Sequence, residues 1–158
     1  MIRLAVQCAG AGADDVGLSD TTGHANPAQV RRLFQKLQHT IGPKMGAAHM
    51  HNTRGLGLAN CLAAFDVGVT TFDSSQGGLG GCPYAPGASG NICSEDAIHM
   101  LDAMGYDTGI DLNKLLNVAR HLPAIVGHDV PSQVAKAGRI TDLHPAPDYV
   151  HELKGETA

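Results

Sequence analysis

The chain lacks the features that would point to a nucleic-acid or membrane protein. Its 158 residues include 11 Lys and Arg against 15 Asp and Glu, for a net charge of −4, and the basic residues are scattered. We expect no nucleic-acid partner, because such proteins concentrate basic residues on one surface. No apolar run approaches the roughly 18 to 20 residues of a membrane-spanning helix. Residues 1–7 are too few and too weakly basic for a signal peptide, so no membrane partner is expected either.

Paired cysteines with metal-binding or redox spacing are also missing. The four cysteines, Cys8, Cys61, Cys82 and Cys93, form no CxxC pair. Since nothing else indicates secretion, we expect reduced thiols and a cytoplasmic location. The length is that of one domain of usual size, with enough chain to bury a core.

What the chain does contain is an alternation of strands and helices. Strand-like apolar segments cover residues 16–19, 45–51 and 69–75. Helical spacing of apolar residues covers 27–42, 56–67, 94–104 and about 111–122, with Ser94 and Asp111 as the expected N-caps of the last two. This order predicts an α/β fold with a parallel sheet and covering helices. Residues 141–158 are polar and contain prolines, so we expect a loose tail there.

Polar residues gather where the predicted strands end. They are Asp20 after the first strand, His49 and His51 at the end of the second, Asp73 near the end of the third, and Cys82 and Asn91 in the loop that follows. Because the carboxyl ends of parallel strands lie along one edge of a sheet, these side chains are expected to meet.

The segment AAHMHNTRG places His49 and His51 two residues apart in a predicted strand. Alternate side chains of a strand face the same way, so both imidazoles project from one face while Met50 points to the other. Such a pair suits a divalent metal ion. The alternative is that one His bonds a backbone group and the other is a surface residue. With no cysteine close by, open positions for oxygen ligands favour Mg²⁺, Mn²⁺ or a similar ion over a closed zinc centre.

The stretch GGLGGCPYAPGASGN, residues 77–91, combines many glycines with one cysteine and two prolines. Glycines allow a loop to move and its backbone to approach a ligand closely, and prolines limit its disorder. At neutral pH a cysteine is mostly a protonated thiol, so Cys82 on such a loop is able to donate a proton over a bound substrate. The alternative is a small residue in a flexible linker. Cys61 lies on an apolar helix face and is predicted to be core, whereas Cys8 and Cys93 have no supporting context.

Four motifs together resemble one enzyme family. LSDTTG, HMHNTRGLGLAN, GVTTFDSSQGGLGGCPYAPGASGN and EDAIHMLDAMGYDTGIDL are similar to segments of 3-hydroxy-3-methylglutaryl-CoA (HMG-CoA) lyase and its bacterial relatives, in the metal-dependent aldolase and lyase superfamily of TIM barrels. The resemblance runs over about residues 12–136. It implies a partial (β/α)8 barrel over residues 1–140, comprising approximately strands five to eight with their helices and a C-terminal helical extension.

The resemblance also implies a role for each matching residue. His49, His51 and Asn91 correspond to ligands of a divalent cation, Cys82 to the loop cysteine that transfers a proton, Asp20 to a pocket carboxylate with a supporting catalytic role, and Glu95 to an acidic position that also suits a helix start. The implied reaction is a retro-Claisen cleavage of an HMG-CoA-type thioester to acetyl-CoA and acetoacetate. In it the metal ion stabilises the alkoxide and the thiol protonates the enolate.

Two features depart from the family pattern. A TIM barrel takes about 250 residues, about 200 at the low end, which exceeds the 158 present. The Arg-Asp pair that family members carry near their first strand, where the aspartate completes the metal site, is also absent from the sequence. We therefore expect a C-terminal half of the enzyme, from a truncated or split reading frame, that is inactive without an N-terminal half.

Two other functions stay open. One is a Claisen-type condensing enzyme of the same superfamily, which the cysteine loop disfavours. The other is a non-catalytic metal-binding remnant, or an assembly subunit whose exposed strand edges pair with another chain. A homodimer would cover those edges without restoring a ligand that neither copy encodes.

Overall fold

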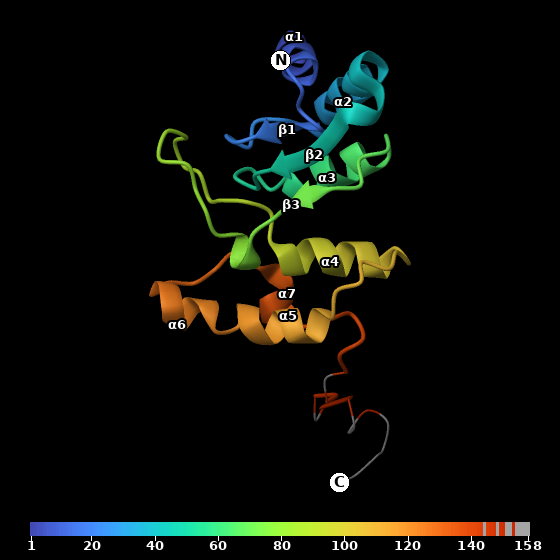
Figure 1. The fold of residues 1–158 in the computed structure, drawn as a ribbon. Coiled ribbons are helices and arrows are strands. Elements are labelled where there is room, and N and C mark those ends of the chain that lie inside the picture. The colour runs from blue at the N-terminus through green and yellow to red at the C-terminus, as the bar shows by residue number, and fades with distance from the viewer. Residues whose placement is uncertain (144, 148, 151–152, 154–158) are drawn as a thin grey trace.

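Strands and helices alternate along the chain in the computed structural model, which describes residues 1–143, 145–147, 149–150 and 153 (Figure 1). The elements in order are α1 (Ile2–Gly10), β1 (Val16–Asp20), α2 (Pro27–Ile41), the 3-10 turn η1 (Gly42–Lys44), β2 (Met45–Met50), α3 (Gly57–Phe65), β3 (Phe72–Asp73), the 3-10 turn η2 (Gln76–Gly78), α4 (Ser94–Ala103), α5 (Leu112–Ala119), α6 (Leu122–Val126) and α7 (Gln133–Ala137). Among the described residues no helix is both long and apolar enough to cross a bilayer.

The sheet is parallel, as the alternation of elements predicts. Its strand order is β1-β2-β3, with Ser19 opposite His49 and His49 opposite Asp73. The first two strands match the expected segments closely, whereas β3 has two residues in place of the seven expected. The α/β class is thus confirmed. The assignment to barrel strands five to eight stays a prediction, because the described sheet has three strands and does not close.

One face of the sheet is packed and the other is open. Leu18, Ala48 and Met50 are buried in the core together with α2 and α3, whereas Gly17 and Ser19 on the alternate positions are exposed. Figure 1 shows α1, α2 and α3 on the same side of the sheet. The helices therefore cover one face, and His49 projects from the face that they leave free.

Helix α2 begins and packs as its sequence predicts. Asn26 caps it by accepting a hydrogen bond from the Gln29 backbone N–H, and Pro27 occupies the first helical position. Phe34 and Leu37 are almost fully buried. Cys61 of α3 lies in the same core, which confirms its predicted structural place.

A second, smaller core joins α4, α5 and α7. Leu112, Leu116 and Val134 are buried there with Ile98 packed against them. Asp111 caps α5 by accepting a hydrogen bond from the Lys114 backbone N–H, as expected. The region after α4 is therefore helical and packed, which agrees with the expected helical extension.

Several expectations about α4 and its neighbours are wrong. The N-cap of α4 is Cys93 and not Ser94, whose hydroxyl lies 2.8 Å from that of Ser74 instead. Asp142, near the start of the expected tail, pairs with Arg139, and the rest of the tail falls partly outside the described residues, so the loose tail stays a prediction. No residue range was predicted for helices α1, α6 and α7. Helix α1 has no capping side chain, no acidic residue in its first turn and no basic residue in its last, so it carries none of the usual start and stop signals.

Candidate functional site

The candidate site lies at the carboxyl edge of the sheet. The predicted meeting of strand ends holds in the register: Asp20 at the end of β1 lies opposite Met50, and Asp73 at the end of β3 lies opposite His49. His51 directly follows β2, and its backbone N–H donates to the Asp20 carbonyl at 3.3 Å. The three strand ends thus bring residues from distant parts of the sequence to one edge.

The two histidines face each other as the strand alternation predicts. His49 Nε2 and His51 Nε2 lie 3.2 Å apart, with ring centroids 5.1 Å apart and ring planes tilted by 58°. His51 is 4% exposed, whereas the His49 side chain is 31% exposed. The alternative in which one of them is a separate surface residue is therefore not what the structure shows.

Asn91 lies beside His51. The two residues form an isolated antiparallel bridge, and directly opposite residues on such a pair have Cβ atoms about 4.5 to 5.5 Å apart on one face. The Asn91 side-chain Nδ2 donates to the Leu79 carbonyl at 2.8 Å, while Oδ1 is buried with no partner among the described residues. The structure thus places Asn91 beside His51, which in turn faces His49.

These donor atoms fit a divalent ion. Two imidazole nitrogens bound to one ion at about 2.1 Å and at roughly 100° to each other lie about 3.2 Å apart, which is the separation of the two Nε2 atoms. A buried amide oxygen without a partner is a suitable third ligand for Mg²⁺ or Mn²⁺. Within the described part of the chain no three His, Cys, Asp or Glu side chains gather to hold a metal. The candidate set is therefore two imidazoles and one amide oxygen, with the other positions open.

Burial favours the neutral imidazole of His51, which is the form that binds metal ions. Its pKa is lowered chiefly by desolvation and further by the neighbouring His49, with a smaller opposing effect from the Asp20 carboxylate. A lowered pKa favours the neutral ring, which has a free lone pair on one nitrogen.

Asp20 has a structural task that the sequence did not reveal. One of its carboxylate oxygens accepts the His24 backbone N–H and the other the Ala25 backbone N–H, each at 3.0 Å. The same loop is held by Asn60 of α3, which donates to the Ala25 carbonyl. Arg54, in the segment between β2 and α3, donates to the Thr22 and Gly23 carbonyls. Asp20 thus shapes the wall beside the histidines. Its catalytic role remains a prediction.

Cys82 lies in the loop between η2 and α4 and is half-buried. In Figure 1 this loop extends on the side toward which the strand arrows point, so it reaches out from the edge that carries the histidines. No hydrogen bond joins the Cys82 thiol to either histidine in the described part of the chain. The loop therefore has the position expected of it, and the role of the thiol stays a prediction.

Glu95 anchors the start of that loop. Its side chain is fully buried, and Oε1 accepts the Gly77 backbone N–H at 2.9 Å. Gly77 adopts a φ of +64°, which a residue with a side chain rarely tolerates. Glu95 lies in the first turn of α4, as expected of an acidic residue at a helix start, and its carboxylate also fixes the turn from which the loop departs.

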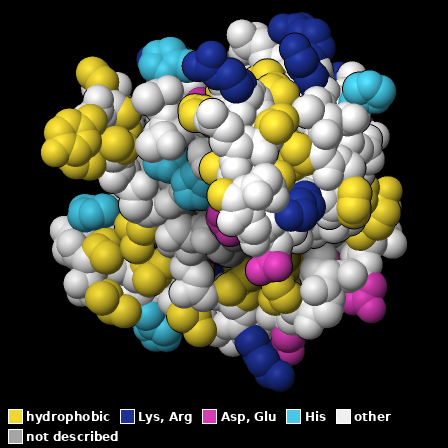
Figure 2. Space-filling model, turned by 45° about the horizontal axis from the view of Figure 1, so that its top comes forward, with side chains coloured by type: hydrophobic (Ala, Val, Ile, Leu, Met, Phe, Trp, Pro, Cys, Tyr) yellow, Lys and Arg dark blue, Asp and Glu magenta, His cyan; other side chains and the backbone are white. Residues whose placement is uncertain are grey.

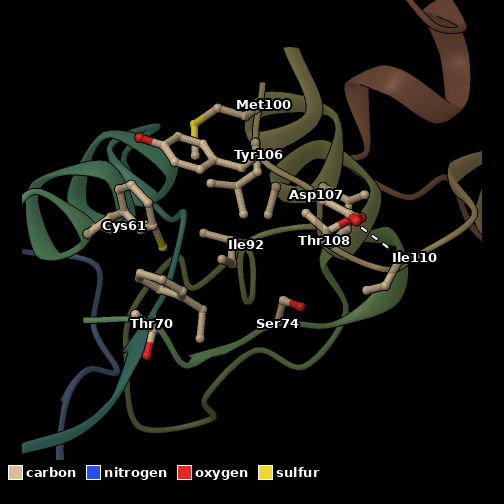
Figure 3. A pocket seen from close by; sticks show the side chains of 14 residues that line it. Cys61, Thr70, Ser74, Ile92, Met100, Tyr106, Asp107, Thr108 and Ile110 are labelled. Atoms are coloured by element: carbon tan, nitrogen blue, oxygen red, sulfur yellow. Dashed lines mark hydrogen bonds between the residues drawn. The ribbon is translucent and has the colours of Figure 1, made fainter. Parts of the chain in front are cut away.

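A separate apolar cavity of about 370 Å³ lies between α3, β3, α4 and the segment after α4. Figure 3 shows Cys61, Met100, Tyr106 and Ile92 around it, together with the hydrogen bond from the Ile110 backbone N–H to the Thr108 hydroxyl. None of the predicted site residues lines it. On the face drawn in Figure 2, Lys and Arg side chains are scattered among hydrophobic and uncharged ones, in line with the absence of a basic patch from the sequence.

Comparison with known proteins decides the family. The profile of the HMGL-like family matches residues 1–122. The chain belongs to the HMGL-like family. This match confirms the family predicted from the motifs. Solved HMG-CoA lyase structures match most of the chain, so its fold is related to that of this TIM-barrel family.

Several of the most similar relatives are named as lyases of CoA esters. An (R)-citramalyl-CoA lyase of Chloroflexus aurantiacus is 45% identical over 129 residues, covering 82% of this chain and 41% of the relative. A hydroxymethylglutaryl-CoA lyase of Bacillus subtilis is 44% identical over 133 residues, covering 84% and 44%. An HMG-CoA lyase structure from Acinetobacter baumannii, in complex with coenzyme A and 3-methylmalate, is 54% identical with a TM-score of 0.87 and covers 92% of this chain and 48% of that one. The chain thus spans less than half the length of these relatives.

Proposed function

We propose that this chain carries the metal-binding and proton-donating part of a lyase that cleaves a 3-hydroxy-3-methylglutaryl-CoA-type thioester to acetyl-CoA and acetoacetate. The observation that carries the proposal is the 3.2 Å separation of His49 Nε2 and His51 Nε2 next to the buried, unpartnered Oδ1 of Asn91. Neither apolar packing nor backbone capping requires that arrangement. A divalent cation bound there supplies Lewis-acid polarisation of the hydroxyl oxygen of the substrate.

The protein groups prepare this site in two ways. Burial favours the neutral ring of His51, which has a free lone pair on one of its two nitrogens. The Asn91 amide presents Oδ1 to the site while its Nδ2 donates to the Leu79 carbonyl, which couples the site to the start of the Cys82 loop. Asp20, Arg54 and Asn60 hold the loop that follows β1, and in this proposal that loop forms a wall of the substrate site.

Cys82 is assigned the proton that completes the cleavage. The hydroxyl of the substrate loses its proton and becomes the ketone carbonyl, the adjacent carbon–carbon bond breaks, and its electron pair passes to the thioester enolate. The Cys82 thiol then gives its proton to the enolate carbon, and the thiolate regains a proton equivalent to the one released by the hydroxyl. A loop closed over the site would keep bulk water from quenching the enolate.

The relatives narrow the substrate class. Their names specify HMG-CoA and (R)-citramalyl-CoA, both CoA thioesters with a tertiary hydroxyl beside the bond that breaks. We assign this chain the same class, without choosing one acyl group. The loop cysteine favours cleavage over the condensing reaction, because cleavage is the direction that ends with protonation of an enolate.

Turnover, in this proposal, requires residues outside these 158. The sheet face that carries Gly17, Ser19 and His49 is open, and the outer edge of β1 has no strand partner in the described part of the chain. Such an edge offers unpaired backbone groups to a further strand. The sequence also contains no Arg-Asp pair of the kind that the family resemblance associates with the metal site. Further strands, from a longer chain or from a partner subunit, would pair with the edge of β1 and supply the missing residues of the site.

The experiment compares the purified chain alone with the chain mixed with the N-terminal half of the Bacillus subtilis relative. Binding of Mn²⁺ is followed by calorimetry, and acetoacetate formation from HMG-CoA is followed by a coupled assay. We expect Mn²⁺ binding in both samples and acetoacetate only in the mixture. Turnover by the chain alone would disprove the need for further residues. Metal binding without turnover in either sample would favour a non-catalytic metal-binding protein, and condensation without cleavage would favour the condensing enzyme.

A further inference from the structure

His49 has a carboxylate neighbour that the proposed mechanism does not use. Asp73 lies directly opposite it in the parallel pairing of β2 with β3, and Asp73 Oδ2 is 3.6 Å from His49 Nδ1. This is an ion-pair contact, longer than a hydrogen bond, that a small side-chain rotation would shorten. Asp73 has no other hydrogen-bond or ion-pair partner among the described residues. Its carboxylate is therefore available to the histidine ring.

The two imidazoles are held in different ways. His51 is 4% exposed and its Nδ1 has no hydrogen-bond partner among the described residues, so packing fixes the ring. The His49 side chain is 31% exposed, and the group that faces its Nδ1 is Asp73. Loss of the Asp73 carboxylate would therefore free the His49 ring and leave the His51 ring in place.

The position of one proton decides what the histidine pair does. With its proton on Nδ1, a neutral His49 offers the lone pair of Nε2 to an ion. With its proton on Nε2, the ring instead donates a hydrogen bond to His51 Nε2 across the 3.2 Å separation, and neither Nε2 atom is then free to bind an ion. A carboxylate at Nδ1 stabilises the first form.

We propose that Asp73 is a positioning residue that accepts the Nδ1 proton of His49 and so holds Nε2 toward the ion site. Partners of this kind are common behind metal-binding histidines, and their loss typically weakens metal affinity by about 10- to 100-fold. This inference rests on the proposed function, since it concerns the same site. The Asp73 side chain is 62% exposed, so it acts by orienting the ring and not by adding a buried charge.

The test is Mn²⁺ titration of the 158-residue chain by calorimetry. We expect Asp73→Ala to weaken affinity by about 10- to 100-fold. Asp73→Asn keeps a side-chain oxygen that accepts the Nδ1 proton, so we expect it to restore part of the loss. The matched control is Asp66→Ala, which removes a similarly exposed carboxylate from a surface pair with Arg31 and should leave Mn²⁺ affinity unchanged. Equal unfolding midpoints for the two alanine variants would show that both are folded.

A second measurement reports the proton directly. Long-range ¹H–¹⁵N spectra of the metal-free chain at pH 8 are expected to show His49 protonated on Nδ1 in the wild type and on Nε2 to a substantial extent in Asp73→Ala. Unchanged affinity and an unchanged tautomer in Asp73→Ala would overturn the proposal. Mn²⁺ titration of His51→Ala distinguishes failure of the ion site from failure of the positioning role of Asp73. If it abolishes Mn²⁺ binding while Asp73→Ala has no effect, only the positioning role fails; if it too binds normally, the ion site itself is wrong.

Discussion

Asn91 donates a 2.8 Å hydrogen bond from its side-chain Nδ2 to the Leu79 carbonyl, while its Oδ1 stays buried without a partner among the described residues. One amide therefore holds the start of the cysteine loop, and its free oxygen is the third ligand in the proposed ion site. Asparagine and glutamine carry both a donor and an acceptor on one planar amide group. Glutamine would place both atoms one methylene farther from the backbone.

Asn91→Asp should separate these two tasks. The carboxylate keeps an oxygen for an ion, so we expect Mn²⁺ affinity to be retained or increased. It cannot donate to Leu79, and loss of a hydrogen bond worth about 0.5 to 1.5 kcal/mol should speed amide exchange in residues 79–90 by roughly 2- to 12-fold. Calorimetry and hydrogen exchange measure the two effects. Asn91→Ala should impair both, and a loop that exchanges no faster in either variant would show that the bond to Leu79 does not restrain it.

His51→Ala should weaken Mn²⁺ affinity more than Cys82→Ser does. His51 is buried beside His49 and Asn91, whereas Cys82 lies in the loop outside that group. Removal of a metal ligand typically costs more than the 10- to 100-fold associated with a residue behind it, so we expect a loss of more than about 100-fold for His51→Ala. Calorimetric titration with Mn²⁺ checks the order. Equal affinities in the two variants would contradict it.

Cys82→Ser should reduce turnover and leave metal affinity near normal. A serine hydroxyl is a much weaker acid than a thiol, so it is a poorer donor to an enolate carbon, and general acid catalysis is typically worth about 10²- to 10⁴-fold in rate. The measurement is acetoacetate release in the reconstituted mixture described above. Cys8→Ser is the matched control, since Cys8 is an exposed thiol on α1. An undiminished rate in Cys82→Ser would remove the thiol from the mechanism.

The sequence predicted the first two strands and the histidine pair well, because those signals are local. Alternation along a strand is enough to place His49 and His51 on one face, and the apolar spacing of α2 is enough to define its buried side. The hydrogen-bond partners of capping residues and carboxylates were harder to predict, because a short polar side chain has several possible partners within reach. Ser94 bonds Ser74 instead of capping α4, and both oxygens of Asp20 are taken by the backbone of its own loop. These choices depend on tertiary neighbours that no local pattern contains.

Glu95→Ala should destabilise the fold more than Glu95→Gln does. The alanine variant leaves the Gly77 N–H buried without its acceptor, which typically costs about 1 to 3 kcal/mol. Glutamine keeps the Oε1 acceptor and nearly the same volume, so its loss should be smaller. Urea unfolding of the two variants provides the comparison. Equal stability of Glu95→Ala and the wild type would mean that the buried carboxylate does not anchor the loop.

The buried thiols should make the fold sensitive to alkaline pH. Burial raises the pKa of Cys61 to about 12 from an ordinary value of 9.0, and burial together with the negative charges of Asp96 and Glu95 raises the pKa of Cys93 as well. A folded-state pKa above the unfolded one means that the stabilisation is complete below about pH 9 and is lost as the pH rises from there toward about 12, because the unfolded chain releases the proton first. The urea midpoint of the wild type should therefore fall between pH 8 and pH 10. Cys61→Ala should show a shallower fall and Cys8→Ser, the exposed control, the same fall as the wild type. A Cys61→Ala variant with an unchanged pH dependence would show that this thiol does not couple ionisation to folding.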